Sequence, residues 1–199
     1  MCEMYSQRDE ELYILNYFKG YTGRFLDIGA YDGKTFSNTH RLARNQWSGV
    51  CVEPSPTAVE ALKRLYAKNQ RIKVYNVGIG SKRGVMAFYH TKDAVSTFDA
   101  DHAELWKQQG VPYTKIEMKV ITLEDLLEQE GYDFDFINTD TEGWDLDILK
   151  TVPFNKLPRL KMFCVEFGKH LGEMLEIFER NGFQKYYQTA ENLLVVKDK

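Results

Sequence analysis

Apolar and polar residues follow two different periods along this chain. Residues 57–69 carry a stripe of apolar side chains at helical spacing, which predicts an amphipathic helix. Residues 24–28 (RFLDI) are apolar almost throughout, which is typical of a strand covered on both faces. By the same criteria, strands are predicted at 49–54, 72–79, 132–140 and 160–167, and helices at 9–18, 35–45, 143–152 and 172–183.

The middle and the end of the chain are less regular. Residues 84–90 alternate like an edge strand or a hairpin arm, and residues 96–110 predict a loop that leads into a helix. Residues 115–129 predict a strand and then a helix, with Thr122 as N-cap and Asp125 at the third helical position. The chain closes with two strand-like runs, QKYYQT and NLLVVK.

Strands and helices therefore alternate in five βα units followed by a strand pair. This order predicts a doubly wound α/β fold, in which ligands bind outside the carboxyl ends of the parallel strands. The 199 residues suit one domain, 1–199, with an N-terminal helix at about 9–18 and a core sheet from about 24 to 199.

Composition and charge argue against several kinds of partner and location. A net charge of −3 gives no electrostatic reason to expect duplex nucleic acid or an anionic membrane as partner. We expect no secretory signal in the first residues and no membrane-spanning helix, because no apolar run approaches ~18 residues. Of the three cysteines, Cys51 and Cys164 lie in apolar runs, so a reducing, cytoplasmic setting is expected.

The stretch DIGAYDG lies at the carboxyl end of the first predicted strand. Glycines at such a turn let a ligand approach the backbone, and the helix that follows offers free N–H groups. Gly29 and Gly33 are four positions apart, so they do not form the Gly-x-Gly-x-x-Gly pattern of dinucleotide sites. The candidate binding residues of this turn are Asp27, Gly29, Ala30, Tyr31 and Gly33. The alternative is a βα turn that uses glycine for geometry alone.

A second and a third strand end add to this candidate site. Glu53 lies 20 residues after Gly33, the separation expected for an acid that binds the ribose hydroxyls of a nucleoside. The alternative is a solvated glutamate at a strand end. The further candidates are Pro54 and Ser55 beside this acid, and Asn76, Val77 and Gly78 where an adenine ring could lie.

Acids also gather at the ends of two later strands. Asp140 and Glu142 lie at the carboxyl end of the fourth strand, and Glu166 lies at the end of the fifth. Neighbouring parallel strands are ~4.8 Å apart, so these carboxylates can converge. Asp145 and Asp147 belong to the next helix and are expected on its solvated face. The alternative for the first pair is a helix N-terminus that is simply rich in acids.

Together, these motifs resemble the FkbM family of methyltransferases. The resemblance rests on FLDIGAYDG, VCVEPSP, NVGIG, Ser96, VITLEDLL and DFINTDTEGWDLDIL, in this order. It implies a Rossmann-like seven-stranded sheet with an antiparallel last strand. It also implies S-adenosylmethionine as methyl donor and a hydroxyl of a sugar, lipid or other metabolite as acceptor. The family usually has Lys-x-Asp-x-Glu-Gly, whereas this chain has Asn138 in place of the lysine.

The resemblance and the predicted cleft suggest a mechanism. Asp140 is the first choice for the group that orients or deprotonates the acceptor, with Glu142 and Glu166 in support. A divalent metal on these acids is possible but not favoured. His170 follows the fifth strand and is a weaker candidate base. The remaining histidines, His40, His90 and His102, are expected to be surface or structural residues.

Three other functions stay open at this point. A nucleic-acid methyltransferase is disfavoured by NTDTEGW after the fourth strand, and a nicotinamide-dependent reductase by the glycine spacing. A non-catalytic module that binds S-adenosylmethionine or a nucleotide is the third. The partner is expected to be a small-molecule or glycan acceptor, contacted by the aromatic-rich region 84–115. The oligomeric state cannot be predicted.

Overall fold

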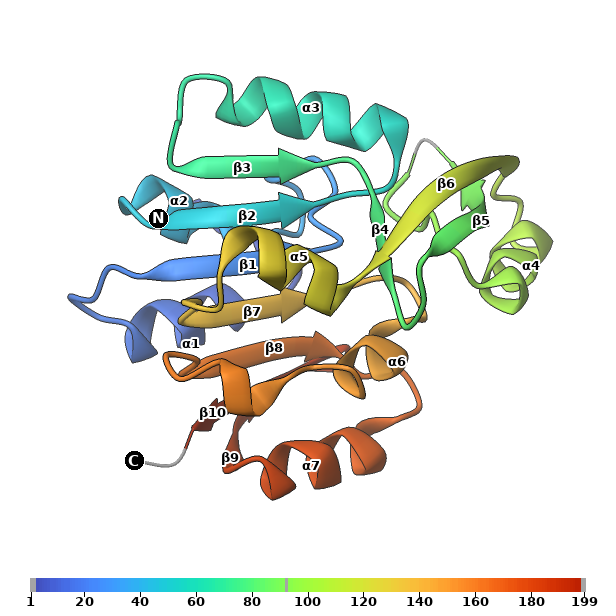
Figure 1. The fold of residues 1–199 in the computed structure, drawn as a ribbon. Coiled ribbons are helices and arrows are strands. Elements are labelled where there is room, and N and C mark those ends of the chain that lie inside the picture. Colours follow the sequence, from blue (N-terminus) through green and yellow to red (C-terminus); the bar gives the residue numbers. More distant parts are fainter. Residues whose placement is uncertain (1–2, 92, 198–199) are drawn as a thin grey trace.

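The computed structural model describes residues 3–91 and 93–197, and its centre is a seven-stranded sheet (Figure 1). In spatial order the strands are β3 (Ile72–Tyr75), β2 (Ser48–Val52), β1 (Arg24–Ile28), β7 (Phe136–Thr139), β8 (Met162–Glu166), β10 (Asn192–Lys197) and β9 (Phe183–Gln188). The first five are parallel, and β10 is antiparallel to both of its neighbours. The doubly wound fold with an antiparallel last strand is confirmed.

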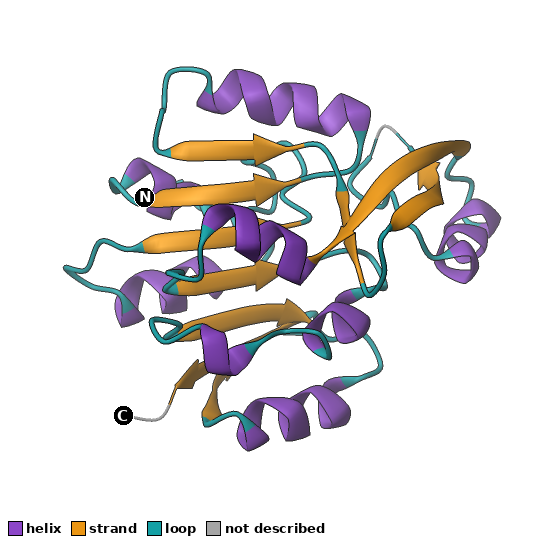
Figure 2. Cartoon of the chain, viewed as in Figure 1, coloured by secondary structure: helices purple, strands orange, loops and turns teal. Residues whose placement is uncertain are grey.

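Helices cover both faces of this sheet (Figure 2). One face packs against α5 (Leu123–Glu130), α6 (Asp145–Leu149) and α7 (Leu171–Arg180). The other packs against α1 (Glu10–Tyr17), α2 (His40–Arg44) and α3 (Pro56–Tyr66). A short 3-10 helix, η1 (Phe154–Lys156), precedes β8. None of the helices formed by the described residues combines the length and apolar composition needed to cross a bilayer.

The strands are buried on both sides because their residues alternate between the two faces. In β1, Leu26 and Ile28 pack against the α5 side, while Phe25 packs against the α1 side. Cys51 and Cys164 are free and buried on that second side, as small apolar residues. A buried polar residue in such a strand needs an internal partner, and Asp27 is the buried polar residue of β1.

A smaller sheet lies beyond the carboxyl ends of the parallel strands (Figure 1). It contains β4 (Gly78–Gly80), β6 (Thr114–Thr122) and β5 (Gly84–His90), in this order, and α4 (Ala100–Gln108) lies beside it. The predicted single strand 72–79 is therefore wrong. Asn76 donates from its amide to the carbonyls of Glu53 (2.9 Å) and Pro54 (3.0 Å). These bonds replace the strand ladder, so the chain leaves the main sheet at this residue.

The predicted helix 35–45 is also wrong over its first half, because α2 begins only at His40. Phe36 has a left-handed backbone (φ 57°), which a helix excludes. The Ser37 hydroxyl accepts from the N–H groups of Thr39 (3.3 Å) and His40 (3.0 Å). Such local bonds compete with the helical ladder, so a polar loop precedes the helix.

The predicted start of α5 is confirmed. The Thr122 hydroxyl accepts from the Asp125 N–H (3.1 Å), and the Asp125 carboxylate accepts from the Thr122 N–H (2.9 Å). This reciprocal pair is a capping box, which satisfies N–H groups that the first helical turn leaves without partners.

We predict that Thr122→Ala lowers the free energy of unfolding by about 1 kcal/mol, because it removes one half of this capping box. Urea denaturation followed by circular dichroism measures the change. Thr114→Ala, at an exposed position on the same strand, is the control and should change stability by less than about 0.5 kcal/mol. Equal effects of the two substitutions would contradict the prediction.

Candidate functional site

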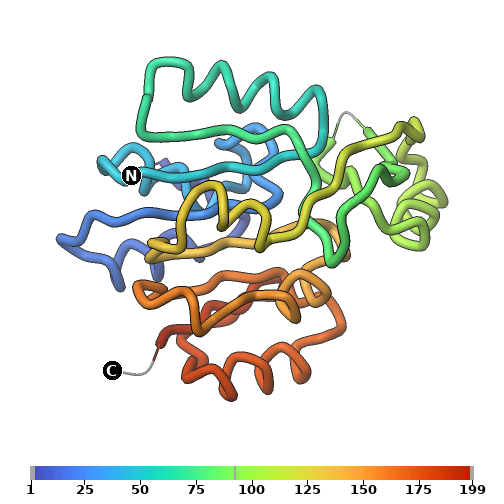
Figure 3. The backbone as a smooth tube through the Cα atoms, viewed as in Figure 1, coloured from blue at the N-terminus to red at the C-terminus, as the bar shows by residue number. Residues whose placement is uncertain are grey.

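Strand register brings the predicted acids to one place. β1 and β7 are far apart in the sequence but run side by side (Figure 3), and Asp27 pairs with Asn138 across them. Asn138 pairs in turn with Cys164 of β8. Side chains two residues apart on a strand share a face, so Asp140 and Glu166 follow this row at the carboxyl edge. The N–H of Asp140 donates to the carbonyl of Ile28 (2.9 Å), which extends the ladder by one residue.

A cavity of about 480 Å³ opens at this edge, between the main sheet and the smaller sheet. It reaches the size of ordinary small-molecule sites. The residues predicted from the sequence that line it are Asp27, Gly29, Ala30, Tyr31, Glu53, Pro54, Ser55, Val77, Gly78, Asp140, Glu142 and Glu166. Gly33 and Asn76, also predicted, do not line it. The described lining residues include neither lysine nor arginine.

Gly29 and Gly33 serve different purposes in the first turn. Gly29 has φ +85°, and a Cβ atom there would lie 1.7 Å from the Asp140 carbonyl oxygen. Only glycine lets the two turns meet so closely. At Gly33, φ +78°, a Cβ atom would instead lie 2.4 Å from Leu62 of α3. The first glycine shapes the cavity, and the second allows the loop to pack on a helix.

The Glu53 carboxylate joins two of the turns. It accepts from the N–H groups of Tyr31 (2.8 Å) and Ser55 (2.6 Å), one on each oxygen. Burial raises the pKa of Glu53 to about 7, although these two bonds oppose the shift. A carboxylate oxygen can accept more than one hydrogen bond, so acceptor capacity remains for a ligand with two neighbouring hydroxyls. The side-chain amide of Asn76 holds this strand end in place through its bonds to the backbone carbonyls of Glu53 and Pro54.

A buried polar layer lies under the cavity. Asp27 accepts from the Thr39 hydroxyl (2.6 Å) and from the Asn138 amide (2.8 Å). The Asn38 amide donates to the Asn138 side-chain oxygen (3.0 Å). Burial raises the pKa of Asp27, and these two donors counteract that shift. Sequence analysis missed Asn38 and Thr39, although both belong to the polar run Ser37–Thr39 that directly precedes α2.

The half-buried acids Asp140, Glu142 and Glu166 line another part of the cavity and repel one another. Burial and then the Glu166 charge raise the pKa of Asp140 well above its usual range. Burial, followed by Asp140, raises the pKa of Glu142 to about 8. The pKa of Glu166 is also raised to about 8, by burial and then by Asp145. Glu142 and Glu166 therefore hold protons near neutral pH.

Glu142 sits in a strained turn that Thr97, together with His102 of α4, holds in place. Its backbone is left-handed (φ 55°), which is rare for a residue with a long side chain. Its carbonyl accepts from the Thr97 hydroxyl (2.6 Å) and lies 2.8 Å from Nδ1 of His102. Trp106 donates its indole N–H to Nε2 of the same ring (2.7 Å), which fixes the proton of the imidazole on Nδ1.

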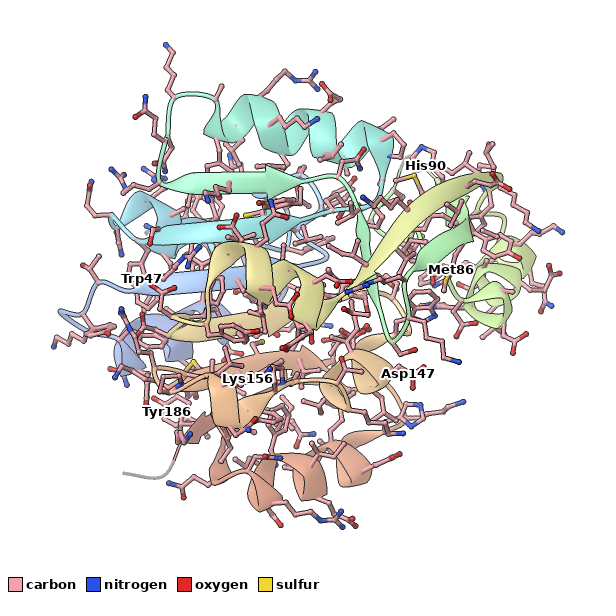
Figure 4. The ribbon with its side chains drawn as sticks, viewed as in Figure 1. Trp47, Met86, His90, Asp147, Lys156 and Tyr186 are labelled. Carbon is pink, nitrogen blue, oxygen red and sulfur yellow. The ribbon has the colours of Figure 1, made fainter. Side chains whose placement is uncertain are left out.

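The structure revises the expected roles of several residues. His102 lines the cavity, and its packing role there could not be foreseen because segment 96–110 has no clear period. His170, the weaker candidate base, does not line the cavity. Asp145 is buried rather than solvated, since its carboxylate accepts from the hydroxyl (2.9 Å) and the N–H of Thr141. Asp147 is exposed as expected (Figure 4).

Aromatic residues form the cavity wall on the side of the smaller sheet. Phe98 stacks on Trp144, with ring centroids 4.6 Å apart. Phe88 and Trp106 also line the cavity, whereas Tyr89 and Tyr113 of the same region do not. Among the described residues, no group of three or more His, Cys, Asp or Glu side chains is arranged to hold a metal ion.

The strand order, with an antiparallel strand inserted next to the last position and a cavity at the carboxyl edge, defines a class I methyltransferase fold. The family model of the methyltransferase FkbM domain matches residues 27–185, and the chain belongs to this family. The search of curated proteins found no match.

Solved structures share the fold at low sequence identity. A methyltransferase FkbM from Methylobacillus flagellatus has a TM-score of 0.57 and 16% identity, over 88% of this chain and 43% of that one. This chain thus spans less than half of that protein. A ribosomal protein L11 methylase from Lactobacillus delbrueckii gives 0.53 and 13%, over 96% and 77%. The magnesium protoporphyrin IX methyltransferase of Synechocystis, solved with bound SAM, gives 0.51 and 11%, over 94% and 76%.

We predict that Gly29→Ala lowers the free energy of unfolding by more than about 2 kcal/mol, because its methyl group would overlap the Asp140 carbonyl. Thermal and urea denaturation measure this. Gly172→Ala is the matched control, since a Cβ atom at that helical glycine meets nothing within 4 Å. A Gly29→Ala protein as stable as the control would show that the two turns do not touch.

The raised pKa values make stability depend on pH. Glu142 and Glu166 release protons near their ordinary pKa of 4.5 when unfolded but only at about 8 when folded. The folded state therefore loses stability as the pH rises from the ordinary pKa of 4.5 to about 8. We predict that Glu142→Gln and Glu166→Gln are each more stable than the unmodified protein by about 1–2 kcal/mol near pH 8, and that the difference shrinks near pH 5.

Urea denaturation at the two pH values tests this prediction. The control is Glu176→Gln, which changes an exposed glutamate of α7 that is paired with Arg180. Its effect should not vary with pH. A constant difference for the two cavity variants, or a loss of stability at the higher pH, would contradict the assignment of raised pKa values to these acids.

Proposed function

We propose that the protein transfers a methyl group from S-adenosylmethionine to a hydroxyl of a small-molecule or glycan acceptor. One observation carries the proposal: a single cavity joins the Gly29 turn and the paired oxygens of Glu53 on one wall to Asp140 on the other. The first wall suits a nucleoside with an amino-acid arm, and the second suits a group that must lose a proton. Membership of a methyltransferase family supports the same reaction.

The donor can be accommodated along the first wall. The ribose hydroxyls would donate to the oxygens of Glu53 that already accept from Tyr31 and Ser55. The adenine ring would lie against Val77 and Gly78, which also line the cavity. The methionine part would pass over Gly29, where the missing side chain leaves room. S-adenosylmethionine bound to the Synechocystis methyltransferase is consistent with this choice of donor.

Methyl transfer is an in-line displacement at the methyl carbon. The acceptor oxygen forms a bond to this carbon while the bond from carbon to sulfur breaks. The electron pair of the broken bond stays on sulfur, and the leaving group is S-adenosylhomocysteine. The acceptor proton passes to a base, for which Asp140 is best placed. Burial and the charge of Glu166 raise the pKa of Asp140, and a raised pKa makes its ionised carboxylate a stronger proton acceptor. Positioning of the two reactants supplies much of the remaining rate.

The aromatic wall indicates how the acceptor could be selected. Phe98, Trp106 and Trp144 present apolar faces beside the acids. A sugar or a planar ring can stack on such faces while its hydroxyl reaches Asp140. Glu142 and Glu166 would orient the same hydroxyl or its neighbours. No metal ion forms part of this proposal.

Binding and turnover test the proposal separately. Calorimetry should detect S-adenosylmethionine and S-adenosylhomocysteine but not nicotinamide adenine dinucleotide. An acceptor screen of sugars, lipids and phenols then identifies the substrate by mass increase. Binding of the nicotinamide cofactor alone would overturn the proposal, and donor binding without any turnover would favour a non-catalytic module.

We predict that Asp140→Asn lowers turnover by at least about 100-fold while S-adenosylhomocysteine still binds within about threefold of its normal affinity. The amide keeps the shape of the side chain but cannot accept the proton. Asp147→Asn, which changes an exposed acid of α6, is the control and should retain full turnover. Full turnover of Asp140→Asn would remove this residue from the mechanism.

A further inference from the structure

A second cavity of about 830 Å³ lies on the side of the sheet that α2 and α3 cover. Its lining comes from the segment before α1, the loop before α2, α2 itself, the end of α3 and the turn that leads into β3. Among the described residues, none lines both this cavity and the cavity of the proposed methyl transfer. We call it the basic groove, because the charged residues that line it are Lys34, Arg44, Lys68, Arg71 and a single acid, Glu3.

Positive charge gathers in the basic groove, against the trend of the whole chain. Four cations and one carboxylate leave a net charge of +3 there, whereas the chain as a whole carries −3. Lys34 pairs with Glu3 (3.4 Å). Within the described part of the chain, no carboxylate forms an ion pair with Arg44, Lys68 or Arg71. Like charges without partners repel one another, so an anion from outside would relieve this repulsion.

Tyr5 holds several of these charges at the wall of the groove. Its hydroxyl accepts from the Arg44 guanidinium (2.6 Å) and donates to the Glu3 carboxylate (2.9 Å). The Lys34 ammonium lies 5.6 Å from the centre of the same ring. Tyr5 is only 6% exposed, so packing fixes the position of its ring. A buried side chain therefore orients the cations at this end of the groove.

The floor of the groove is polar and buried. His40 and Tyr66 are 6% and 7% exposed, and Nδ1 of His40 lies 3.4 Å from the Tyr66 hydroxyl. Burial lowers the pKa of His40, and the charges of Arg44 and then Lys34 lower it further. The positive potential of the groove therefore reaches its floor.

A terminal diphosphate matches this charge and this chemistry. Such a group carries about three negative charges near neutral pH, because a phosphate monoester carries about −1.5 to −2 and the inner phosphate adds one more. The planar guanidinium groups of Arg44 and Arg71 can each bind two phosphate oxygens, and a lysine supplies a point charge. These two arginines belong to different elements, α2 and the turn before β3, which favours a ligand with more than one phosphate.

A membrane surface fits the groove less well. Faces that bind membranes combine basic residues with large exposed apolar side chains. Of the large apolar side chains that the described residues expose, only Leu65 (39%) lines the groove. One such side chain suits the organic part of a single bound molecule.

We propose that the basic groove binds the terminal diphosphate of a small molecule, with Arg44 and Arg71 holding the phosphate oxygens and Lys34 and Lys68 adding positive charge. This site goes beyond the proposed methyl transfer and does not depend on it. The organic part of the ligand would extend from the diphosphate along Leu65 and Tyr66.

Calorimetry near neutral pH, without divalent metal ions and at matched ionic strength, compares pyrophosphate with phosphate and sulfate. Pyrophosphate should bind at least roughly tenfold more tightly than either single anion, because it can contact cations of two elements. Uridine diphosphate and geranyl diphosphate are then titrated to distinguish a nucleoside from an apolar organic part. At least one of them should bind as tightly as pyrophosphate.

Variants locate the binding in the groove. Arg44→Gln and Arg71→Gln should each weaken pyrophosphate binding by roughly tenfold or more, the usual effect of losing a hydrogen bond to a charged group. Arg64→Gln is the matched control, since it removes the same charge from an exposed position of α3 outside the groove, and it should change the affinity by less than about threefold. Glu3→Gln removes the one acid of the groove and should strengthen binding, whereas Glu60→Gln on the exposed face of α3 should not.

The proposal is overturned if pyrophosphate binds no more tightly than sulfate, or if both organic diphosphates bind more than about tenfold more weakly than pyrophosphate. It is also overturned if Arg64→Gln weakens binding as much as Arg71→Gln. Vesicles of phosphatidylcholine and phosphatidylserine are a further probe, and capture by these vesicles without pyrophosphate binding would assign the groove to a membrane instead. Thermal unfolding verifies that each variant is folded, and Arg71→Gln provides the test if Arg44→Gln, which loses its bond to Tyr5, is not.

Discussion

The contact between two chain turns governs the candidate site. The carbonyl oxygen of Asp140 occupies the position where a side chain at residue 29 would begin. The β1 and β7 turns can meet only because residue 29 is glycine, and their meeting joins the wall with Glu53 to the wall with Asp140. The size and chemistry of the cavity follow from this contact. Distances across the site are therefore set by backbone atoms, which move less readily than side-chain atoms.

Much of the site could be predicted because parallel strands end at one edge of a sheet. Glu53, Asp140 and Glu166 each end a recognisable apolar run, so sequence alone brings them together. Asn38 and His102 escaped prediction for a different reason. Their partners, Asn138 and the Glu142 carbonyl, are distant in the sequence, and no local period marks them. The functions of these two side chains arise only from tertiary contacts.

The fold shows the same division between local and distant causes. The Thr122 capping box was predictable because both of its residues lie within one turn. The break after β3 was not, since it depends on bonds from Asn76 to carbonyls of another strand end. Gly33 matched the motif by spacing, yet it contacts Leu62 rather than the cavity. Motif spacing identifies a turn, but packing decides what each glycine in it does.

The contacts that Thr97 and His102 make with the Glu142 carbonyl link two properties that enzymes often vary separately. Thr97 and His102 hold its carbonyl, and both belong to the segment that carries the aromatic wall. Under the proposed function, a substitution that reshapes this segment for another acceptor would also move Glu142, an acid of the proposed reaction centre. If the segment selects the acceptor as proposed, a new specificity would require paired changes, one in the segment and one in the turn. Single substitutions that broaden acceptor range should be uncommon among its natural variants.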